Sequence, residues 1–299
     1  MEEKIVLGVD IGGSHITATL VDLNNGRVLE GTGIRNFVDA NANSKEIISL
    51  WADVIRKAFK KYPVIEKKIG IAMPGPFDYS AGIAWMQNQD KYDSLYGLNV
   101  KELLADKLHI PSLDIRFIND AESFLKGETY SGAAKDAASA IGLTLGTGFG
   151  SARYCNGKVE DADLWCSPFL DGIAEDYLST RWFVAQYKTL TGKAVLGVKE
   201  LAALVDQDLN AAGTFREFGF NLALFLRHII IKENPETIVI GGNISKAFHL
   251  FYKELDMHLE TLNSKPTIYK TILEEEASLV GAASCWAGVG EQVLETIRA

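Results

Sequence analysis

Two glycine-rich turns, one in each half of the chain, constrain the fold more than any other feature. Each turn joins two apolar, strand-like runs and is followed by a tight-turn signal. The first turn is Asp10-Ile-Gly-Gly-Ser-His15, between Ile5–Val9 and Ile16–Val21; the second is Gly146-Thr-Gly-Phe-Gly150, between Ile141–Leu145 and Ser151–Cys155. A repeated strand, glycine turn and returning strand predicts two related lobes, with the functional site expected in a cleft between them.

Helical patterns follow each of these strand clusters. Apolar residues recur at helical spacing in several segments, and Ser44 is the expected N-cap of the first. The predicted helices cover residues 44–62, 100–108, 171–188, 198–205, 215–233, 246–262 and 279–297. Strands alternating with helices predict an α/β architecture. We place the N-terminal lobe at residues 1–119, completed by a C-terminal helix at 286–299, and the second lobe at 120–285.

The composition excludes several classes of partner. The chain has 30 Lys and Arg against 39 Asp and Glu, a formal net charge of −9, so its field repels nucleic acid and anionic lipid. No apolar run reaches about 18 residues, the length that a membrane-spanning helix needs. Three cysteines, Cys155, Cys166 and Cys285, form no CxxC pair, which is typical of a reducing compartment. We therefore expect a cytoplasmic protein that binds neither nucleic acid nor a membrane.

Glycine turns of this kind can cradle an anion. Successive backbone N–H groups point into such a turn, and glycine lets a phosphate approach without a clash at Cβ. Hairpins also use glycine merely to reach a positive φ, so one turn alone is weak support for phosphate binding. Asp10 ends an apolar strand, where its carboxylate could hold Mg²⁺ through water or could simply cap the turn. Neither G-x-G-x-x-G nor G-x-x-x-x-G-K-[ST] occurs in the chain.

Two further strand ends carry candidate residues. Asn119 and Asp120 follow the apolar run Ile115–Ile118, at the kind of position where α/β proteins place ligand-binding groups. Asp120 could accept a proton from a substrate hydroxyl, or it could cap the following helix. Gly241 and Gly242 follow a second apolar run and could let a purine or ribose lie against the backbone.

The ordered motifs resemble those of the ROK family, within the superfamily that contains hexokinase and actin. The motifs are Asp10-Ile-Gly-Gly-Ser14, Met73-Pro-Gly-Pro-Phe-Asp78, Ile118-Asn-Asp-Ala121, Leu145-Gly-Thr-Gly-Phe-Gly150 and Ile240-Gly-Gly242. The match covers essentially the whole chain. The resemblance implies two ribonuclease H-like lobes, ATP between them, and transfer of its γ-phosphoryl group to a hydroxyl, at C6, of a hexose or N-acetylhexosamine.

The resemblance also implies roles for individual residues. Asp120 would be the catalytic base, and Asp10 would hold Mg²⁺ through water. The implied nucleotide-binding residues are Asp10, Gly12, Gly13, Ser14, Gly146, Thr147, Gly148, Gly150, Gly241 and Gly242. The implied sugar-binding residues are Gly75, Asn88, Asn119, Glu160, Asp163 and Glu175.

One departure from the family pattern concerns zinc. Many ROK proteins carry a Glu-x-Gly-His element followed by three clustered cysteines, which together bind a structural zinc ion. Here only Cys166 remains of the cysteines, Asp163 replaces the histidine, and four tetrahedral N or S ligands cannot be assembled locally. We therefore expect no zinc site, while the exchange at Asp163 leaves the identity of the sugar open.

Two other functions are compatible with the motifs. A non-catalytic, sugar-sensing regulator would act through a protein partner, because the acidic chain starts its first strand near Lys4, without a preceding helix-turn-helix domain. An actin-like or chaperone-like ATPase would hydrolyse ATP without sugar. The resemblance favours a kinase that forms a homodimer or homotetramer.

Overall fold

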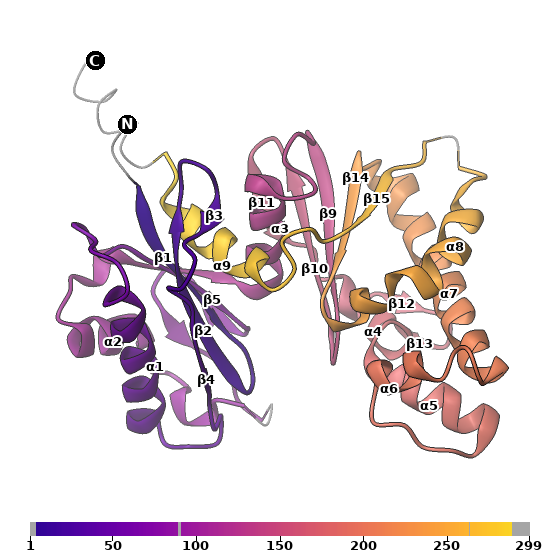
Figure 1. Cartoon of the computed structure of the whole chain (residues 1–299), viewed down its shortest axis with the longest axis horizontal. Coiled ribbons are helices and arrows are strands. Elements are labelled where there is room, and N and C mark those ends of the chain that lie inside the picture. Colours follow the sequence, from indigo (N-terminus) through magenta and orange to yellow (C-terminus); the bar gives the residue numbers. More distant parts are fainter. Residues whose placement is uncertain (1–3, 89–90, 263, 289–299) are drawn as a thin grey trace. The chain divides into compact units, whose positions relative to one another are not determined.

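The computed structural model describes residues 4–88, 91–262 and 264–288. The chain divides into two compact units, Met1–Gly132 with Glu275–Ala299, and Ala133–Glu274, called unit 1 and unit 2 here (Figure 1). Unit 1 therefore extends beyond residue 119 and also takes in a segment from the end of the chain.

Unit 1 is built on a mixed sheet with the order β3-β2-β1-β5-β8, in which β4 also pairs with β2. Strands β1, β2 and β3 are antiparallel, whereas β1, β5 and β8 run parallel. The elements of unit 1 are β1 Ile5–Ile11, β2 His15–Asp22, β3 Arg27–Val28, β4 Ile34–Phe37, α1 Ser44–Phe59, β5 Ile69–Met73, β6 Phe77–Asp78, β7 Ile83–Ala84, α2 Val100–Leu108, β8 Ile115–Asn119, α3 Asp120–Ser131 and α9 Glu276–Ala283.

The two faces of this sheet are covered by different helices (Figure 1). Alternate residues of β1, such as Leu7, Val9 and Ile11, are fully buried in a core shared with α1 and α2. Helices α3 and α9 cover the opposite face. There a Cβ on Gly8 would lie 2.1 Å from the Leu279 carbonyl oxygen, and one on Gly70 would lie 1.9 Å from that of Ala282. The backbone of α9 thus rests directly on the sheet, which only glycine permits.

Unit 2 repeats the same sheet plan with the order β11-β10-β9-β14-β15. Strands β9, β10 and β11 are antiparallel, whereas β9, β14 and β15 are parallel. The elements of unit 2 are β9 Ser139–Leu145, β10 Phe149–Cys155, β11 Lys158–Asp161, β12 Pro168–Phe169, β13 Gly172–Ile173, α4 Ala174–Tyr177, α5 Thr180–Thr191, α6 Val198–Ala203, α7 Leu209–Glu233, β14 Thr237–Gly241, α8 Phe248–Leu259 and β15 Thr267–Lys270.

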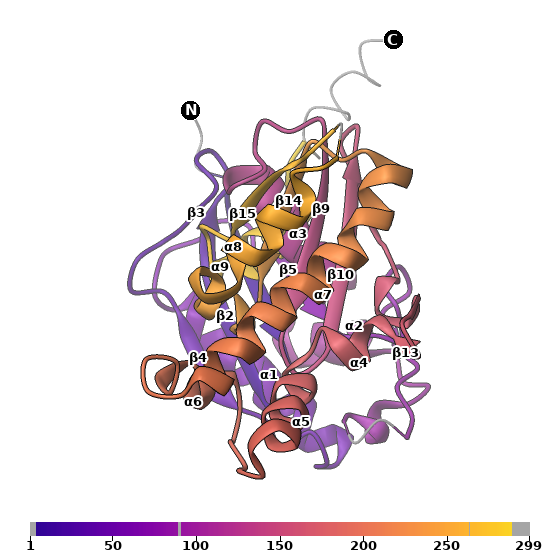
Figure 2. The same cartoon turned by 90° about the vertical axis from the view of Figure 1, so that its right-hand side faces the viewer.

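The long helix α7 organises the core of unit 2. Its apolar side chains, among them Phe215, Phe218 and Leu222, are fully buried with Ile141 and Leu143 of β9. Helix α8 packs beside α7, as Figure 2 shows. The shared strand order of the two units confirms the predicted α/β fold with two ribonuclease H-like lobes.

Three local predictions need correction. The side chain that caps α1 is Asn43, which accepts from the Glu46 N–H at 3.0 Å, and not Ser44. The helix predicted over residues 171–188 is divided into α4 and α5, because the chain is extended at Ser179, with φ −125° and ψ 169°. The helix predicted over 279–297 is α9, which ends at Ala283. Residues 289–299, which include most of the helix predicted to complete the N-terminal lobe, lie outside the described residues.

Strand β4 was not predicted, because its four residues carry no clear alternation of apolar side chains. None of the helices in the described part of the chain has both the length and the apolarity needed to cross a membrane.

Candidate active site

Three adjacent parallel strands of unit 1 end at one edge of the sheet, and each is followed by predicted site residues. Asp10 is the penultimate residue of β1, Gly75 lies two residues beyond β5, and Asn119 and Asp120 are at the end of β8. The register aligns Asp10 with Ala72 and Ala72 with Ile118 across the three strands. The carboxyl edge of parallel strands is the usual ligand-binding edge in α/β proteins.

The Asp10 side chain is only partly exposed, in a region rich in negative charge. Desolvation raises the pKa of Asp10 to about 7, and the neighbouring carboxylates of Asp120 and Glu275 add to the rise, whereas Arg35 opposes it. A carboxylate that is costly to ionise gains from a bound cation. Asp10 is therefore a carboxylate that could hold a cation.

The turn after Asp10 is anchored from the core side. The Tyr92 hydroxyl donates to the Gly12 carbonyl oxygen at 2.6 Å, and the buried Tyr92 ring packs edge-on against Trp51 of α1. The Gly12 N–H donates to the His15 carbonyl oxygen at 2.9 Å. Gly13 and Ser14 are exposed, and a Cβ on Gly13 would meet no described atom within 4 Å. The solvent side of the turn thus has room for a phosphate.

Asn119 holds two segments of the site together. Its side-chain oxygen caps α3 by accepting from the N–H groups of Ala121 at 2.8 Å and Glu122 at 3.2 Å. Its Nδ2 donates to the Tyr79 hydroxyl at 3.1 Å, and that hydroxyl donates to the Met73 carbonyl oxygen at 3.1 Å. The cap that the sequence allowed for Asp120 is therefore supplied by Asn119.

Asp120 is the first residue of α3 and is exposed. Desolvation by the surrounding protein raises the pKa of its carboxyl group, while the Ala121 N–H, which donates to Oδ1 at 2.9 Å, and Lys91 oppose the rise. Because an exposed carboxylate keeps part of its hydration, the rise is smaller than for a buried one. A raised pKa makes Asp120 a better proton acceptor.

In unit 2, the Gly146 turn joins β9 to β10 and is anchored by Glu175. Glu175 Oε2 accepts from the Phe149 N–H at 2.9 Å, and its Oε1 pairs with Arg181 at 2.5 Å. The Gly146 N–H donates to the Gly148 carbonyl oxygen at 3.0 Å. Thr147 is exposed, and a Cβ on Gly146 would meet no described atom within 4 Å. This turn, like the one after Asp10, is fixed from one side and open on the other.

The end of β14 lies against the same turn. Gly242 has a φ of +78°, and a Cβ on it would lie 2.4 Å from the oxygen and 2.7 Å from the nitrogen of Leu145. Gly241 pairs with Thr144 in the parallel register of β14 and β9. The two glycines predicted to contact adenosine are therefore next to Gly146.

Three predicted sugar-binding residues are more exposed. Glu160 forms an ion pair with Lys158, and the hydrogen bond from Lys158 holds the pKa of Glu160 below its ordinary range. Asp163 has a φ of +48°, and its N–H donates to Asp161. Asn88 is exposed, and its N–H donates to Asp93. Within unit 2, Glu175 lies at the Gly146 turn, whereas Glu160 and Asp163 belong to the hairpin that follows it.

The residues that anchor the site were not predicted. Tyr79, Tyr92 and Arg181 hold Asn119, Gly12 and Glu175 through the bonds given above. Tyr79 is 40 residues from Asn119 and Tyr92 is 80 residues from Gly12, whereas Arg181 is only six residues from Glu175, but none of the three lies within a motif given above. A tyrosine within an otherwise polar loop, as at Tyr92, is the one signal that could have pointed to an anchor.

The carboxylates at this edge suit Mg²⁺, which needs few protein ligands, better than they suit a metal ion held by protein side chains alone. In the ranges 4–88, 91–262 and 264–288, no three His, Cys, Asp or Glu side chains come together to hold a metal. Mg²⁺ commonly takes one or two carboxylates and completes its shell with waters and phosphate oxygens. Asp10, beside the open turn at Gly13, could supply the one carboxylate of such a shell.

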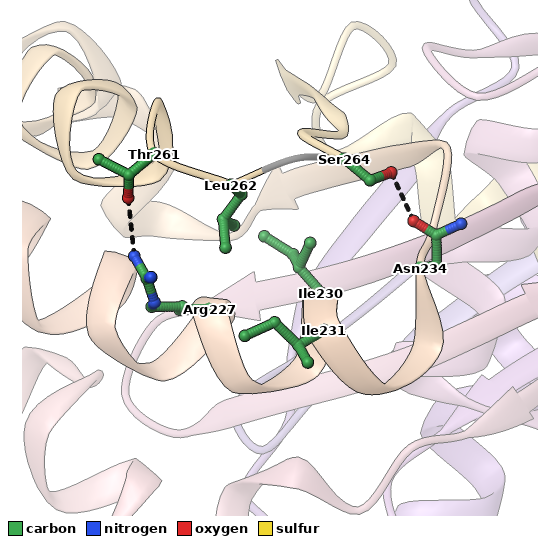
Figure 3. A pocket seen from close by; sticks show the side chains of 7 residues that line it. All are labelled: Arg227, Ile230, Ile231, Asn234, Thr261, Leu262 and Ser264. Atoms are coloured by element: carbon green, nitrogen blue, oxygen red, sulfur yellow. Dashed lines mark hydrogen bonds between the residues drawn. The ribbon is translucent and has the colours of Figure 1, made fainter.

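A separate pocket of about 350 Å³ lies in unit 2 between the end of α7 and the segment after α8 (Figure 3). Ile230, Ile231 and Leu262 form its apolar side, and Arg227 donates to the Thr261 hydroxyl at 2.9 Å. None of the predicted site residues lines it.

The repeated sheet defines an α/β protein with the two-lobe fold of solved ROK hexokinases. A model of the ROK family matches residues 6–163 and 165–289. The chain therefore belongs to the ROK family.

Individual members of the family align over nearly the whole chain. An N-acetyl-D-glucosamine kinase from Mannheimia succiniciproducens is 26% identical over 314 residues, which cover 94% of this chain and 98% of that protein. The ROK hexokinase of Thermus thermophilus superposes with a TM-score of 0.76 at 20% identity, covering 99% of this chain and 100% of its own. A ROK glucokinase from Streptomyces griseus, in complex with glucose and AMPPNP, superposes with a TM-score of 0.74 at 22% identity, covering 94% and 98%.

Proposed function

We propose that the chain is an ATP-dependent sugar kinase that phosphorylates the C6 hydroxyl of a hexose or an N-acetylhexosamine. The observation that carries this proposal is the meeting of Asp10, Asn119 and Asp120 at the carboxyl edge of adjacent parallel strands. One carboxylate beside an open amide turn suits a phosphate and its cation, and a second carboxylate suits a proton acceptor. The names of the relatives, N-acetyl-D-glucosamine kinase and glucokinase, support the sugar-kinase part of this proposal.

In this mechanism Asp120 accepts the proton of the attacking hydroxyl, and general-base catalysis of this kind contributes roughly 10²- to 10⁴-fold. The amides of Gly12 to Ser14 and of Gly146 to Gly150 hold nucleotide phosphates, and Gly241 and Gly242 contact adenosine. Mg²⁺, when bound through water to Asp10, supplies positive charge to the phosphates. The remaining work is positioning, because phosphoryl transfer needs little covalent help from the protein.

The sugar contacts form the remaining part of the proposal. Asn119, Gly75 and Asn88 from unit 1, and Glu160, Asp163 and Glu175 from unit 2, are the proposed contacts. Both Glu175 oxygens already have protein partners, so Glu175 would share its carboxylate between the Gly146 turn and a sugar hydroxyl.

The test is release of ADP across a panel of glucose, mannose, fructose, N-acetylglucosamine and N-acetylmannosamine, with and without each sugar. We expect turnover on at least one sugar, none on its 6-deoxy analogue, and little ADP release without sugar. Asp120→Asn should lower kcat by about 100-fold or more while calorimetry still detects sugar binding. Asp106→Asn, which removes an exposed carboxylate on α2, is the matched control and should be fully active.

The same assay separates the alternatives. Full activity of Asp120→Asn would show that Asp120 is not the catalytic base. Sugar binding without any turnover would favour the regulator that acts through a protein partner, and ADP release without sugar would favour an ATPase.

We also propose that the protein is a homodimer or homotetramer. The exposed side chains Phe220, Leu224 and Ile231 lie on one side of α7 and are the surface that we would test. Sedimentation velocity of the wild type and of Leu224→Glu measures the assembly, and a monomeric wild type would contradict the proposal.

A further inference from the structure

The register of unit 1 places an arginine beside the proposed magnesium carboxylate. Asp10 of β1 pairs with Thr17 of β2, and Thr17 pairs with Arg35 of β4. Residues paired across neighbouring strands point to the same face of a sheet. Asp10 and Arg35 therefore project from one face, two strand spacings or roughly 10 Å apart at the backbone.

This face is the one on which α9 lies. Helix α9 crosses it obliquely, with Glu275, the residue before α9, at Arg35, with Leu279 over Gly8 and with Ala282 over Gly70. The Arg35 side chain is 54% exposed and that of Glu275 is 67% exposed. Arg35 thus lies beyond the start of α9, beside the carboxyl edge of β1, and has room to contact a ligand.

We propose that Arg35 binds the terminal phosphate of the nucleotide and stabilises the charge on the phosphoryl group during its transfer. The inference rests on the proposed function and deepens it by naming a further residue. An arginine guanidinium is always charged, and its planar fork matches two phosphate oxygens at once. A positive group fixed where charge lies in the transition state lowers the barrier without reorganising.

The partner of Arg35 is suited to being exchanged for a phosphate. Arg35 Nη1 lies 3.0 Å from Glu275 Oε2, and both side chains are exposed, so solvent screens the pair and its net stabilisation is small. Glu275 holds the guanidinium at the site without occupying all of its donors. The His15 side chain, on the same face, is less free than Arg35, because its ring packs edge-on against Phe37 and its Nδ1 lies 2.8 Å from Ser14 Oγ.

The test compares two nucleotides that differ in the terminal phosphate. Calorimetry with Mg²⁺ present measures AMPPNP and ADP binding to the wild type, Arg35→Ala and Arg35→Lys. We expect Arg35→Ala to weaken AMPPNP about tenfold or more and ADP less than about twofold, with Arg35→Lys in between. In turnover, kcat should fall about 100-fold with the sugar KM unchanged.

Two controls separate this role from a structural one. Arg56→Ala breaks a comparable exposed pair, with Asp53 at 2.6 Å on α1, and should change neither affinity. Glu275→Gln removes the competitor of the phosphate and should keep or tighten AMPPNP binding. Equal weakening of ADP and AMPPNP by Arg35→Ala, or weakening of AMPPNP by Glu275→Gln, would overturn the proposal.

The outcome also distinguishes this inference from the proposed function. If the wild type turns over sugar and Arg35→Ala binds AMPPNP normally, only the proposed role of Arg35 is refuted. If the wild type binds AMPPNP through Arg35 but phosphorylates no sugar, only the proposed kinase activity is refuted. If the wild type binds no nucleotide, both the kinase activity and the role of Arg35 are refuted.

Discussion

At the residue scale, the Asp10 carboxylate makes stability depend on pH. Its pKa is raised from 3.8 to about 7, so the folded protein binds this proton more tightly than the unfolded chain does. Stability is then highest below about pH 4 with respect to this group, and it falls as the pH rises through 7. The full effect is at most about 4 kcal/mol, and partial exposure of the side chain reduces it.

Asp10→Asn should therefore be more stable than the wild type at pH 8, by about 1 to 3 kcal/mol, with the difference vanishing near pH 4. Urea unfolding at several pH values measures it, with Asp106→Asn as the control that should show no such pH dependence. If Asp10→Asn is only as stable as the wild type at pH 8, ionisation of Asp10 does not destabilise the folded protein.

Tyr92 tests how the nucleotide turn is held. Tyr92→Phe removes the hydroxyl that donates to the Gly12 carbonyl oxygen at 2.6 Å, and it should lower stability by about 1 kcal/mol. Because the turn loses its anchor, the KM for ATP should rise severalfold while the KM for sugar changes little. Tyr252→Phe, which removes a hydroxyl bonded to Asp256 in unit 2, is the control. Lower stability with an unchanged KM for ATP would give Tyr92 a structural role only.

The functional residues themselves could be predicted from sequence, but their partners could not. Asp10, Asn119 and Gly146 each follow an apolar run, so strand and motif could be read together. The partner of Asn119 is Tyr79, 40 residues away, and that of Gly12 is Tyr92, 80 residues away. Such contacts depend on tertiary packing, of which a local pattern carries no record.

At the scale of elements, the junction between β14 and the Gly146 turn depends on Gly242. Gly242→Ala would place a Cβ 2.4 Å from the Leu145 carbonyl oxygen, so the two strand ends must separate. Gly157 has a similar φ, +85° against +78°, but a Cβ on it would meet no described atom within 4 Å. Gly157→Ala should therefore lower the free energy of unfolding by only about 1 to 2 kcal/mol.

We expect Gly242→Ala to lose about 2 kcal/mol more than Gly157→Ala in urea unfolding, and to weaken nucleotide binding. Gly242 also has a ψ of 178°, in a backbone region that is almost restricted to glycine, so the difference reports the clash with Leu145 together with the strain of that conformation. Equal losses would mean that β14 and the turn separate without cost.

Elements were predictable where a strand or helix has its own periodic pattern. Helix α1 was predictable, because apolar residues recur on one side of it: Ile47, Trp51, Val54 and Ala58. Strand β4 was not, since its place beside β2 is fixed by pairing and not by its four residues. Strand β4 carries Arg35, so this residue of the proposed site could not be predicted from the sequence either.

At the scale of the whole molecule, the two units share one strand order although their helices differ. The repeat was predictable because its glycine turns occur at matching places. The return of the chain to unit 1 after Glu274 was harder to place, because the fit of α9 depends on glycines from other elements. These are Gly8, Gly70 and Gly127, whose Cβ atoms would meet the backbone of α9.

This return of the chain sets the order in which the units can be completed on the ribosome. Unit 2 is continuous from Ala133 to Glu274, so it can bury its core as soon as that stretch has emerged. Unit 1 begins first, but the face of its sheet that α3 and α9 cover together lacks α9 until residues 276–283 are made. N-terminal domains usually fold first, but here unit 2 can be completed before unit 1. The nascent protein carries an unfinished first unit throughout the synthesis of the second.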